Sequence, residues 1–305
     1  MKIQHLTERE KGIIALVGMA LIYGLLPLLP RFLEESLTVF QQIYLRMALG
    51  FLLTLVFFHR RVTIKKFLKL SKKELGWVFF RSLLYYSLGV GLYTVAVLHA
   101  KISNVIFIEA IPMTALLGFV LLREKITFPK MLLVFISFCG VLLIAVKQIG
   151  ISFEFGIGEL AALASSFFVS LGLITRKWQS TTLNDYETGT LMLFFASFQM
   201  VFISLITRES LPIHGWNGTI AFVLLLGGLF NAALSFLLNY SFARVDAVLA
   251  SNVISLQTLF ALIFAYIVFR EVPLPRELLG GVVILAGAIL LHRYEKRNKV
   301  IKDQK

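Results

Sequence analysis

The chain contains two stretches that read alike, REKITFPKMLLVFISFCGVLL at Arg123–Leu143 and REVPLPRELLGGVVILAGAIL at Arg270–Leu290. They align without gaps, and five of the aligned residues are identical, including the leading Arg-Glu pair and the glycines Gly140 and Gly287. In each stretch a short polar opening is followed by an apolar run. A chain that closes both halves with the same pattern is expected to contain an internal repeat.

The segments just upstream extend the similarity. AKISNV begins at Ala100 in the first half, and ARVDAV begins at Ala243 in the second. From Ala100 to Arg123 there are 23 residues, whereas from Ala243 to Arg270 there are 27. This difference predicts about one additional helical turn in the second half.

The composition indicates that lipid, not water, surrounds most of the chain. A soluble domain is charged at about a quarter of its residues, whereas here 15% are charged and 58% are hydrophobic. The mean hydropathy is +0.84. The net charge of +13 would suggest nucleic acid in a soluble protein. Here the basic residues lie in short segments between apolar runs, which is typical of membrane topology, and no nucleic-acid partner is expected.

Ten segments are long and apolar enough to cross a bilayer, which takes about 20 residues in a helix. They are roughly residues 12–30, 38–58, 76–97, 102–122, 131–147, 158–176, 187–206, 217–241, 247–269 and 278–292. All should be helices, because backbone groups in lipid find partners only in a helix or a closed barrel. Five spans per half is an odd number, so the halves must insert with opposite orientations. The expected fold is an all-α integral membrane protein with ten transmembrane helices in two inverted five-helix repeats, residues 1–147 and 148–305.

The distribution of Lys and Arg predicts that both termini are cytoplasmic. With that orientation the inside segments hold 22 of the 30 basic residues and the outside segments hold six. Cytoplasmic loops of membrane proteins carry such an excess. Seven of the inside residues lie between Arg60 and Lys73, where binding of anionic lipid is the alternative explanation. The expected location is the cell membrane.

The order and motifs of these segments resemble those of EamA-type members of the drug/metabolite transporter superfamily. That family typically opens with W-G-x6-K in helix 1, and here Tyr23-Gly24 is followed seven residues later by Arg31. It typically has an arginine in helix 2, which Arg46 matches. Tyrosine in place of tryptophan and arginine in place of lysine are departures from the pattern.

Helices 4 and 9 carry the rest of the resemblance. Helix 4 of the family has a proline about twelve residues before a terminal glutamate, and Pro112 and Glu124 match this spacing. Helix 9 lacks the usual proline and has Gln257-Thr258 there, which puts its bending in doubt. The resemblance implies a central cavity formed mainly by helices 1, 3, 4, 6, 8 and 9, and transport of small polar metabolites.

Glu109 lies within the apolar run FIEAIPM, at Phe107–Met113. An ionisable group at bilayer depth is costly and usually faces a cavity or a partner. Counted along their helices, Glu109 and Arg46 have a similar depth, so one hypothesis is a buried ion pair that joins helices 2 and 4. The other is a carboxylate that binds a proton or the substrate, with Arg46 tuning it. The two hypotheses are compatible.

Pro112 is expected to kink helix 4 beside this carboxylate. Its ring nitrogen cannot donate a hydrogen bond to the carbonyl of Ile108. The freed carbonyl is then available to a ligand, and the kink could serve as a hinge or be purely structural.

Polar side chains in the other spans offer further candidates. Asn231, Ser235 and Asn239 form a stripe on helix 8, and Tyr86 shares a face of helix 3 with Gly89 and Tyr93. Small polar residues also join helices to one another in membranes, and Arg81 could either reach toward the interface or capture an anionic substrate. The residues that we expect to bind substrate are Tyr23, Tyr86, Glu109, Ser166, Asn231, Asn239 and Gln257.

The sequence offers no catalytic or metal-binding motif. It lacks GxxxxGK[ST] and HExxH, its five histidines are scattered, and Cys139 is its only cysteine. We therefore expect no cofactor, no metal and no enzymatic activity. The favoured function is a secondary transporter, an exporter or exchanger of a small polar metabolite such as an amino acid or related zwitterion, with protons as candidate coupling ions. A membrane-embedded enzyme or receptor is the alternative, and the protein could be a monomer or a homodimer.

Overall fold

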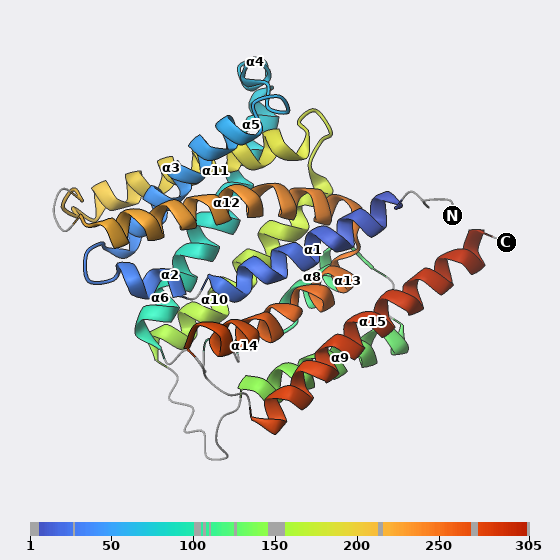
Figure 1. Ribbon diagram of the computed structural model, residues 1–305. Coiled ribbons are helices and arrows are strands. Elements are labelled where there is room, and N and C mark those ends of the chain that lie inside the picture. The colour runs from blue at the N-terminus through green and yellow to red at the C-terminus, as the bar shows by residue number, and fades with distance from the viewer. Residues whose placement is uncertain are drawn as a thin grey trace.

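The computed structural model describes residues 6–303 apart from 27, 101–104, 106, 107, 110, 125, 126, 146–155, 213–215 and 270–273. Regular structure in the described part is entirely helical (Figure 1). The first half contains α1 (Glu8–Leu25), α2 (Leu28–Leu33), α3 (Val39–Phe57), α4 (Ile64–Phe67), α5 (Lys72–Ser82), η1 (Leu83–Val90), α6 (Gly91–His99), α8 (Met113–Leu121) and α9 (Phe128–Ala145). The second contains α10 (Ile157–Ile174), η2 (Thr175–Trp178), α11 (Asp185–Ile206), α12 (Gly218–Arg244), α13 (Ala247–Ile254), α14 (Leu256–Phe269) and α15 (Pro275–Asp303).

Several long helices begin where the sequence provides a capping box. The side chains of Thr7, Thr38, Ser71 and Asn184 each accept a hydrogen bond from the backbone three residues later, and a Glu or Gln there returns one. These bonds satisfy amide groups that the first turn of a helix leaves without partners. They fix the starts of α1, α3, α5 and α11, so short local motifs mark the polar boundaries between spans.

Five described helical segments are long and apolar enough to cross a membrane, namely 39–57, 72–99, 157–178, 185–206 and 218–244. Shorter apolar segments cover 128–143, 247–261 and 278–294. Each of these eight segments lies over one of the ten expected spans, with ends that shift by several residues. The expected division between the repeats falls at residues 147 and 148, outside the described residues, and stays a prediction.

Two spans are interrupted at matching places. Helical backbone at Glu109 stops before Pro112, which precedes the first residue of α8. In the other half Ser255 separates α13 from α14, and its hydroxyl donates to the carbonyl oxygen of Asn252 over 2.6 Å. Pro112 is twelve residues after Ala100, and Ser255 is twelve after Ala243. The second half therefore breaks its helix without a proline, which answers the doubt raised by Gln257-Thr258.

The helices pack as a bundle whose chain ends meet on one side. α1 begins and α15 ends on the same side, which we call the terminal side (Figure 1). α9 and α15 lie side by side along one edge, and α3, α11 and α12 pack together along the opposite edge (Figure 1). The repeated glycines lie between α9 and α15: a Cβ on Gly140 would lie 2.8 Å from the carbonyl oxygen of Gly280, and one on Gly287 would meet Ser137. The similar stretches of the two halves thus pack against each other.

Close packing of α11 on α12 predicts a stability defect at Gly189. A Cβ there would lie 2.6 Å from the backbone oxygen of Ser235, and backbone cannot give way as a flexible side chain can. Gly189→Ala should lower the unfolding free energy by about 1–3 kcal/mol, measured as a lower melting temperature in detergent. Gly76→Ala is the matched control because nothing lies within 4 Å of its Cβ position, and alanine favours a helix by up to about 1 kcal/mol. Equal melting temperatures for the two variants would contradict the packing.

Candidate functional site

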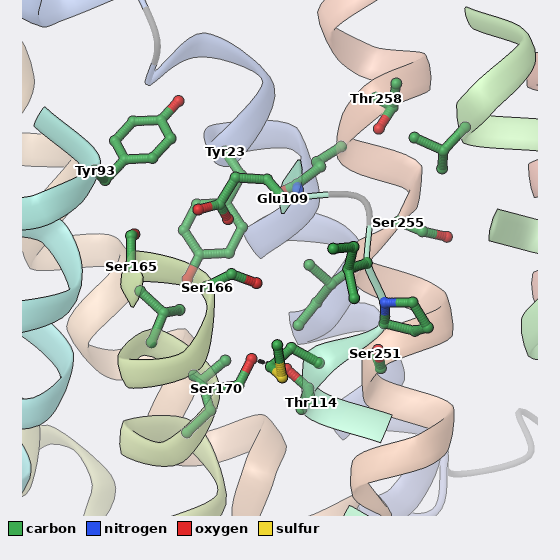
Figure 2. Close-up of a pocket in the computed structure, with 18 of the residues that line it drawn as sticks. Tyr23, Tyr93, Glu109, Thr114, Ser165, Ser166, Ser170, Ser251, Ser255 and Thr258 are labelled. Atoms are coloured by element: carbon green, nitrogen blue, oxygen red, sulfur yellow. Dashed lines mark hydrogen bonds between the residues drawn. The ribbon is translucent and has the colours of Figure 1, made fainter. Parts of the chain in front are cut away.

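A cavity of about 190 Å³ lies where the two halves of the bundle face each other. Its walls come from α1, η1, α6, the residues before and after Pro112, α9, α10, α13 and α14 (Figure 2). Both helix interruptions border this cavity, through Pro112 and Ser255. Irregular backbone at membrane depth is tolerated where it lines a cavity. The position of the cavity therefore accounts for the position of the two helix interruptions.

The wall combines hydroxyl and amide groups with one carboxyl group. Most polar lining residues are neutral; they are Tyr23, Tyr85, Tyr93, Thr114, Ser137, Ser165, Ser166, Ser170, Ser251, Asn252, Ser255, Gln257 and Thr258. Several already bind one another: the hydroxyls of Thr114 and Ser170 are 2.8 Å apart, and Asn252 donates to Ser137 over 3.0 Å. These bonds hold the wall together across the two halves.

Glu109 carries the only carboxylate among the described residues that line the cavity. Its Oε1 is buried and has no hydrogen-bond partner. The hydroxyl of Ser165 in α10 donates its hydrogen to the backbone oxygen of Gly89 over 3.0 Å, and Figure 2 shows the carboxyl of Glu109 directed toward Tyr23 and the serines of α10. A buried carboxylate oxygen without a partner is unusual, because leaving it unpaired costs free energy. The geometry leaves Glu109 free to bind a cationic group or a proton.

The expected ion pair between Glu109 and Arg46 is not formed in this structure. Both residues are described, yet no ion pair joins them, and the Nε of Arg46 donates to the backbone oxygen of Gln42 over 3.0 Å. Tyr93 lines both the central cavity, which Glu109 also lines, and a smaller adjoining cavity that Arg46 lines. Depth along a helix does not tell which way a side chain is turned about its helix axis, so the sequence could not decide whether the pair forms.

The tyrosines of the third span that line the cavity are not the ones expected from the sequence. Tyr85 and Tyr93 line the cavity, whereas Tyr86 is fully buried elsewhere and its hydroxyl has no partner in the described part of the chain. The cause is η1, a π-helix, which places an extra residue in the turn. That residue rotates Tyr85 onto the face that ordinary α-helical spacing assigns to Tyr86. The Tyr85 hydroxyl is hydrogen-bonded to that of Tyr23.

The remaining expected site residues fall into two groups. Ser166 and Gln257 line the cavity together with Tyr23 and Glu109. Asn231 lines a smaller adjacent cavity, and Asn239 lines neither. Asn239 instead accepts a hydrogen bond from Nη1 of the buried Arg81 over 3.0 Å and donates to Ser235 over 2.7 Å. Pattern alone could not separate Asn239 from Asn231, because both lie on one stripe of the same helix.

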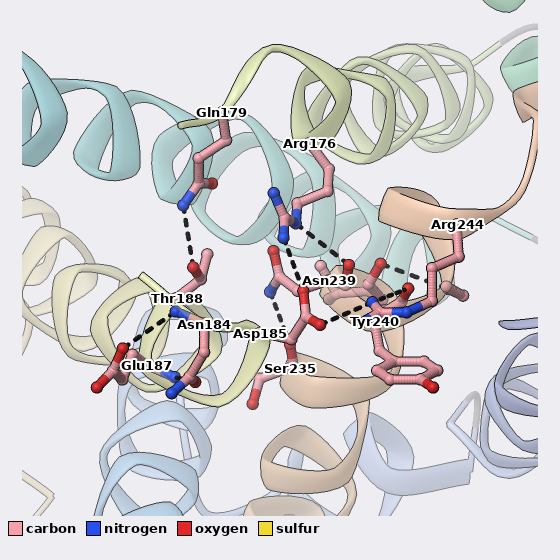
Figure 3. Close-up of polar contacts among 12 residues, drawn as sticks. Arg176, Gln179, Asn184, Asp185, Glu187, Thr188, Ser235, Asn239, Tyr240 and Arg244 are labelled. Atoms are coloured by element: carbon pink, nitrogen blue, oxygen red, sulfur yellow. Dashed lines mark hydrogen bonds and ion pairs between the residues drawn. The ribbon is translucent and has the colours of Figure 1, made fainter. Parts of the chain in front are cut away.

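A network of charged residues lies on the terminal side of the bundle (Figure 3). Asp185 at the start of α11 binds Nη2 of Arg176 over 2.7 Å and Nη1 of Arg244 over 2.8 Å. Arg244 continues to Glu8 at the start of α1, with its Nε 2.9 Å from the carboxylate. Nearby, the carboxylate of Glu124 accepts the amides of Ala247 and Val248 at 2.8 and 3.2 Å, which caps α13. The glutamate singled out by its spacing from Pro112 therefore joins the first half to the second.

Comparisons with known proteins agree with this architecture. The sequence profile of the EamA-like transporter family matches residues 10–146 and again residues 156–293. A crystal structure of a protein at 14% identity superposes with a TM-score of 0.76, covering 93% of this chain and 98% of that one, which indicates a shared fold.

Three proteins that are similar in sequence are named as transporters. An uncharacterised transporter of Synechocystis sp. is 28% identical over 262 residues, 80% of this chain and 72% of the relative. One of Clostridium kluyveri is 23% identical over 303 residues, 96% of each. An S-adenosylmethionine uptake transporter of Rickettsia conorii is 24% identical over 215 residues, 70% of each. The family and these names indicate a membrane transporter rather than an enzyme, and the chain belongs to the EamA-like transporter family.

Proposed function

We propose that this transporter carries a small metabolite with a positively charged amine, such as an amino acid or a related zwitterion. The observation that supports this most directly is Glu109, a half-buried residue on the wall of the central cavity whose Oε1 is buried without a partner among the described residues. The described residues around the cavity supply no Lys, Arg or His to neutralise it. An amine that enters the cavity would gain the counter-charge that the protein leaves open.

Energetics favour a ligand at this position over a purely structural role. An ionised carboxylate at mid-membrane costs roughly 2.5–3.5 kcal/mol on insertion scales. A structural carboxylate would be expected to offset that cost with a nearby cation, but no described residue forms an ion pair with Glu109. A substrate cation or a proton would offset it instead. Since both compete for one carboxyl group, exchange of substrate against protons is the simplest coupling.

The size of the cavity and one relative bear on the substrate. S-adenosylmethionine, named for the Rickettsia relative, carries an amine, a sulfonium and a carboxylate, so it belongs to the same charge class. Pockets for drug-sized ligands occupy about 300–1,000 Å³, whereas this cavity has about 190 Å³. In the conformation described, the cavity suits a metabolite nearer the size of an amino acid.

Alternating access would use the two helix interruptions as hinges. Pro112 and Ser255 lie at matching points of the two halves and both border the cavity. In the conformation described here, the network centred on Asp185 would hold the terminal side closed. In the opposite conformation the network would come apart and the terminal side would open. We place both termini in the cytoplasm on the evidence of 22 basic residues in inside segments against six in outside segments.

Replacement of the carboxyl should abolish transport without unfolding the protein. Glu109→Gln keeps the size but removes the charge, so uptake of amine-bearing metabolites into liposomes should fall at least about tenfold. The melting temperature should stay the same or rise, because an unpaired buried charge is lost. Wild-type transport should weaken as pH falls on the substrate side, since protons compete for the carboxylate, and this dependence should vanish in the variant.

The control for this experiment is Glu34→Gln, which removes an exposed carboxylate outside the cavity. It should retain wild-type transport and wild-type pH dependence. If Glu109→Gln also retained both, a role for Glu109 in substrate or proton binding would be ruled out. If it instead lost activity only in proportion to lost folded protein, Glu109 would be a packing residue.

The orientation can be tested by cysteine labelling. In a Cys139→Ala background, Lys69→Cys should react with a membrane-impermeant maleimide only after the cells are opened. Leu211→Cys should react in intact cells. Leu211 is 67% exposed and follows the C-terminal end of α11. Reaction of both cysteines from the same face would contradict an odd number of crossings between them and with it the inverted arrangement.

A further inference from the structure

A second, smaller cavity of about 30 Å³ adjoins the central one. The two cavities share Tyr23, Tyr85 and Tyr93 among their lining residues. The hydrogen bond between the hydroxyls of Tyr23 and Tyr85 therefore forms part of the partition. Beyond that partition the wall is contributed by Arg46 of α3 and Asn231 of α12.

Arg46 is buried in this wall with most of its hydrogen-bonding capacity unused. The residue is 3% exposed. Within the described part of the chain its guanidinium makes one hydrogen bond, from Nε to the carbonyl of Gln42 in its own helix. Nη2 is buried without a partner, and no described carboxylate forms an ion pair with the residue.

The surroundings hold the guanidinium at the cavity rather than letting it reach the membrane surface. A Cβ on Gly227 would lie 2.6 Å from Cδ and 2.9 Å from Cγ of Arg46, so the missing side chain makes room for the arginine stem. Asn231 donates its Nδ2 hydrogen to the carbonyl of Gly227 over 2.7 Å. This bond fixes the amide beside the cavity.

The chemistry of this wall selects a small anion. A guanidinium offers paired N–H donors that match the two oxygens of a carboxylate. A water molecule occupies about 30 Å³ in the liquid, so the cavity has room for one small charged group and not for a whole metabolite. On the other side of the tyrosines, Glu109 presents the opposite charge.

We propose that Arg46 and its cavity form the subsite for the carboxylate of a zwitterionic substrate, whose amine binds Glu109 in the central cavity. This deepens the proposed function and rests on it, because it assigns the second charge of the same substrate. Tyr23, Tyr85 and Tyr93 line both cavities. Rotation of the tyrosines would let one substrate reach both charges, so the Tyr23–Tyr85 hydrogen bond acts as a partition that opens when substrate binds.

The proposal predicts that loss of the Arg46 charge does not lower the stability of the protein. If Arg46 were a structural strut, its removal would lower the melting temperature, as loss of a partner in a buried pair does. Here the charge has no partner in the empty protein, so Arg46→Gln should leave the melting temperature unchanged or raise it. Loss of function together with retained stability is typical of a binding residue.

The probes are the twenty proteinogenic amino acids, together with the primary amine and the N-acetyl derivative that match the best of them. In thermal-shift titrations of the purified full-length protein, the wild type should bind the amino acid at least about tenfold more tightly than the amine. Arg46→Gln should reduce amino-acid affinity to that of the amine and leave amine affinity unchanged. Glu109→Gln should weaken the amine and the amino acid but spare the N-acetyl derivative.

Further variants guard against an uninformative result. Gly227→Ala keeps the charge but displaces the arginine stem, so it should produce the same selective loss if Arg46→Gln fails to fold. Gly18→Ala is its control, because the nearest atom to its Cβ position is 3.7 Å away. Arg60→Gln, which removes an exposed arginine, controls for net charge.

The outcomes separate this proposal from the proposed function. Amine binding that depends on Glu109, with equal affinity for amine and amino acid in the wild type, would overturn the carboxylate subsite alone. Failure of amines and amino acids alike to bind would overturn both. A free anion is the other source of the same chemistry: binding that falls in the wild type, but not in Arg46→Gln, when chloride is replaced by gluconate would assign the cavity to chloride and reject the substrate carboxylate.

Discussion

The backbone of a membrane protein must satisfy its own hydrogen bonds, and the rest of this structure depends on that constraint. It explains why regular structure in the described chain is helical, because lipid offers amide groups no partner. It also limits where a helix can be interrupted. The breaks at Pro112 and Ser255 border the central cavity, where ligand, water or neighbouring hydroxyls can replace the lost backbone partners. The proposed binding site and its proposed hinges therefore share one location, since irregular backbone is tolerated where polar groups line a cavity.

The charged side chains of Glu109 and Arg46 do not pair with each other, which leaves both available to a ligand in the proposed function. Glu109 and Arg46 each have a buried polar atom, Oε1 and Nη2 respectively, that has no hydrogen-bond partner among the described residues. Tyr93 lines both of the cavities that these two residues line, and the stem of the arginine packs against Gly227. The protein thereby forgoes the stability of a buried ion pair. An internal pair would have to be broken before either group could hold a substrate, whereas separated charges are ready for a ligand that brings both counter-charges at once.

The sequence allowed the helical architecture, the internal repeat and a polar cavity with Glu109 to be predicted, because each depends on composition or local pattern. It did not allow the side-chain directions to be predicted. Tyr86 was preferred over Tyr85 because the spacing assumed an α-helix, and the π-helix at Leu83–Val90 adds a residue to the turn. Arg46 was matched to Glu109 by depth, and rotation about the helix axes decided otherwise. The break at Ser255 has no proline to announce it; its hydroxyl bonds back to Asn252, which a sequence containing many serines does not single out.

In the alternating access that we propose, the graded exposure of the network on the terminal side suits repeated opening. Side chains of Arg176 and Asp185 are 9% and 11% exposed, that of Arg244 is 26% exposed, and that of Glu8 is 61% exposed. Exposed ion pairs contribute at most about 1 kcal/mol, because water replaces them readily when they separate. The outer contacts can therefore part at little cost and admit water, which then solvates the inner pair before it separates. A closure built wholly from buried pairs would lack this sequence of steps, since separating a buried pair first exposes charge to an apolar surrounding.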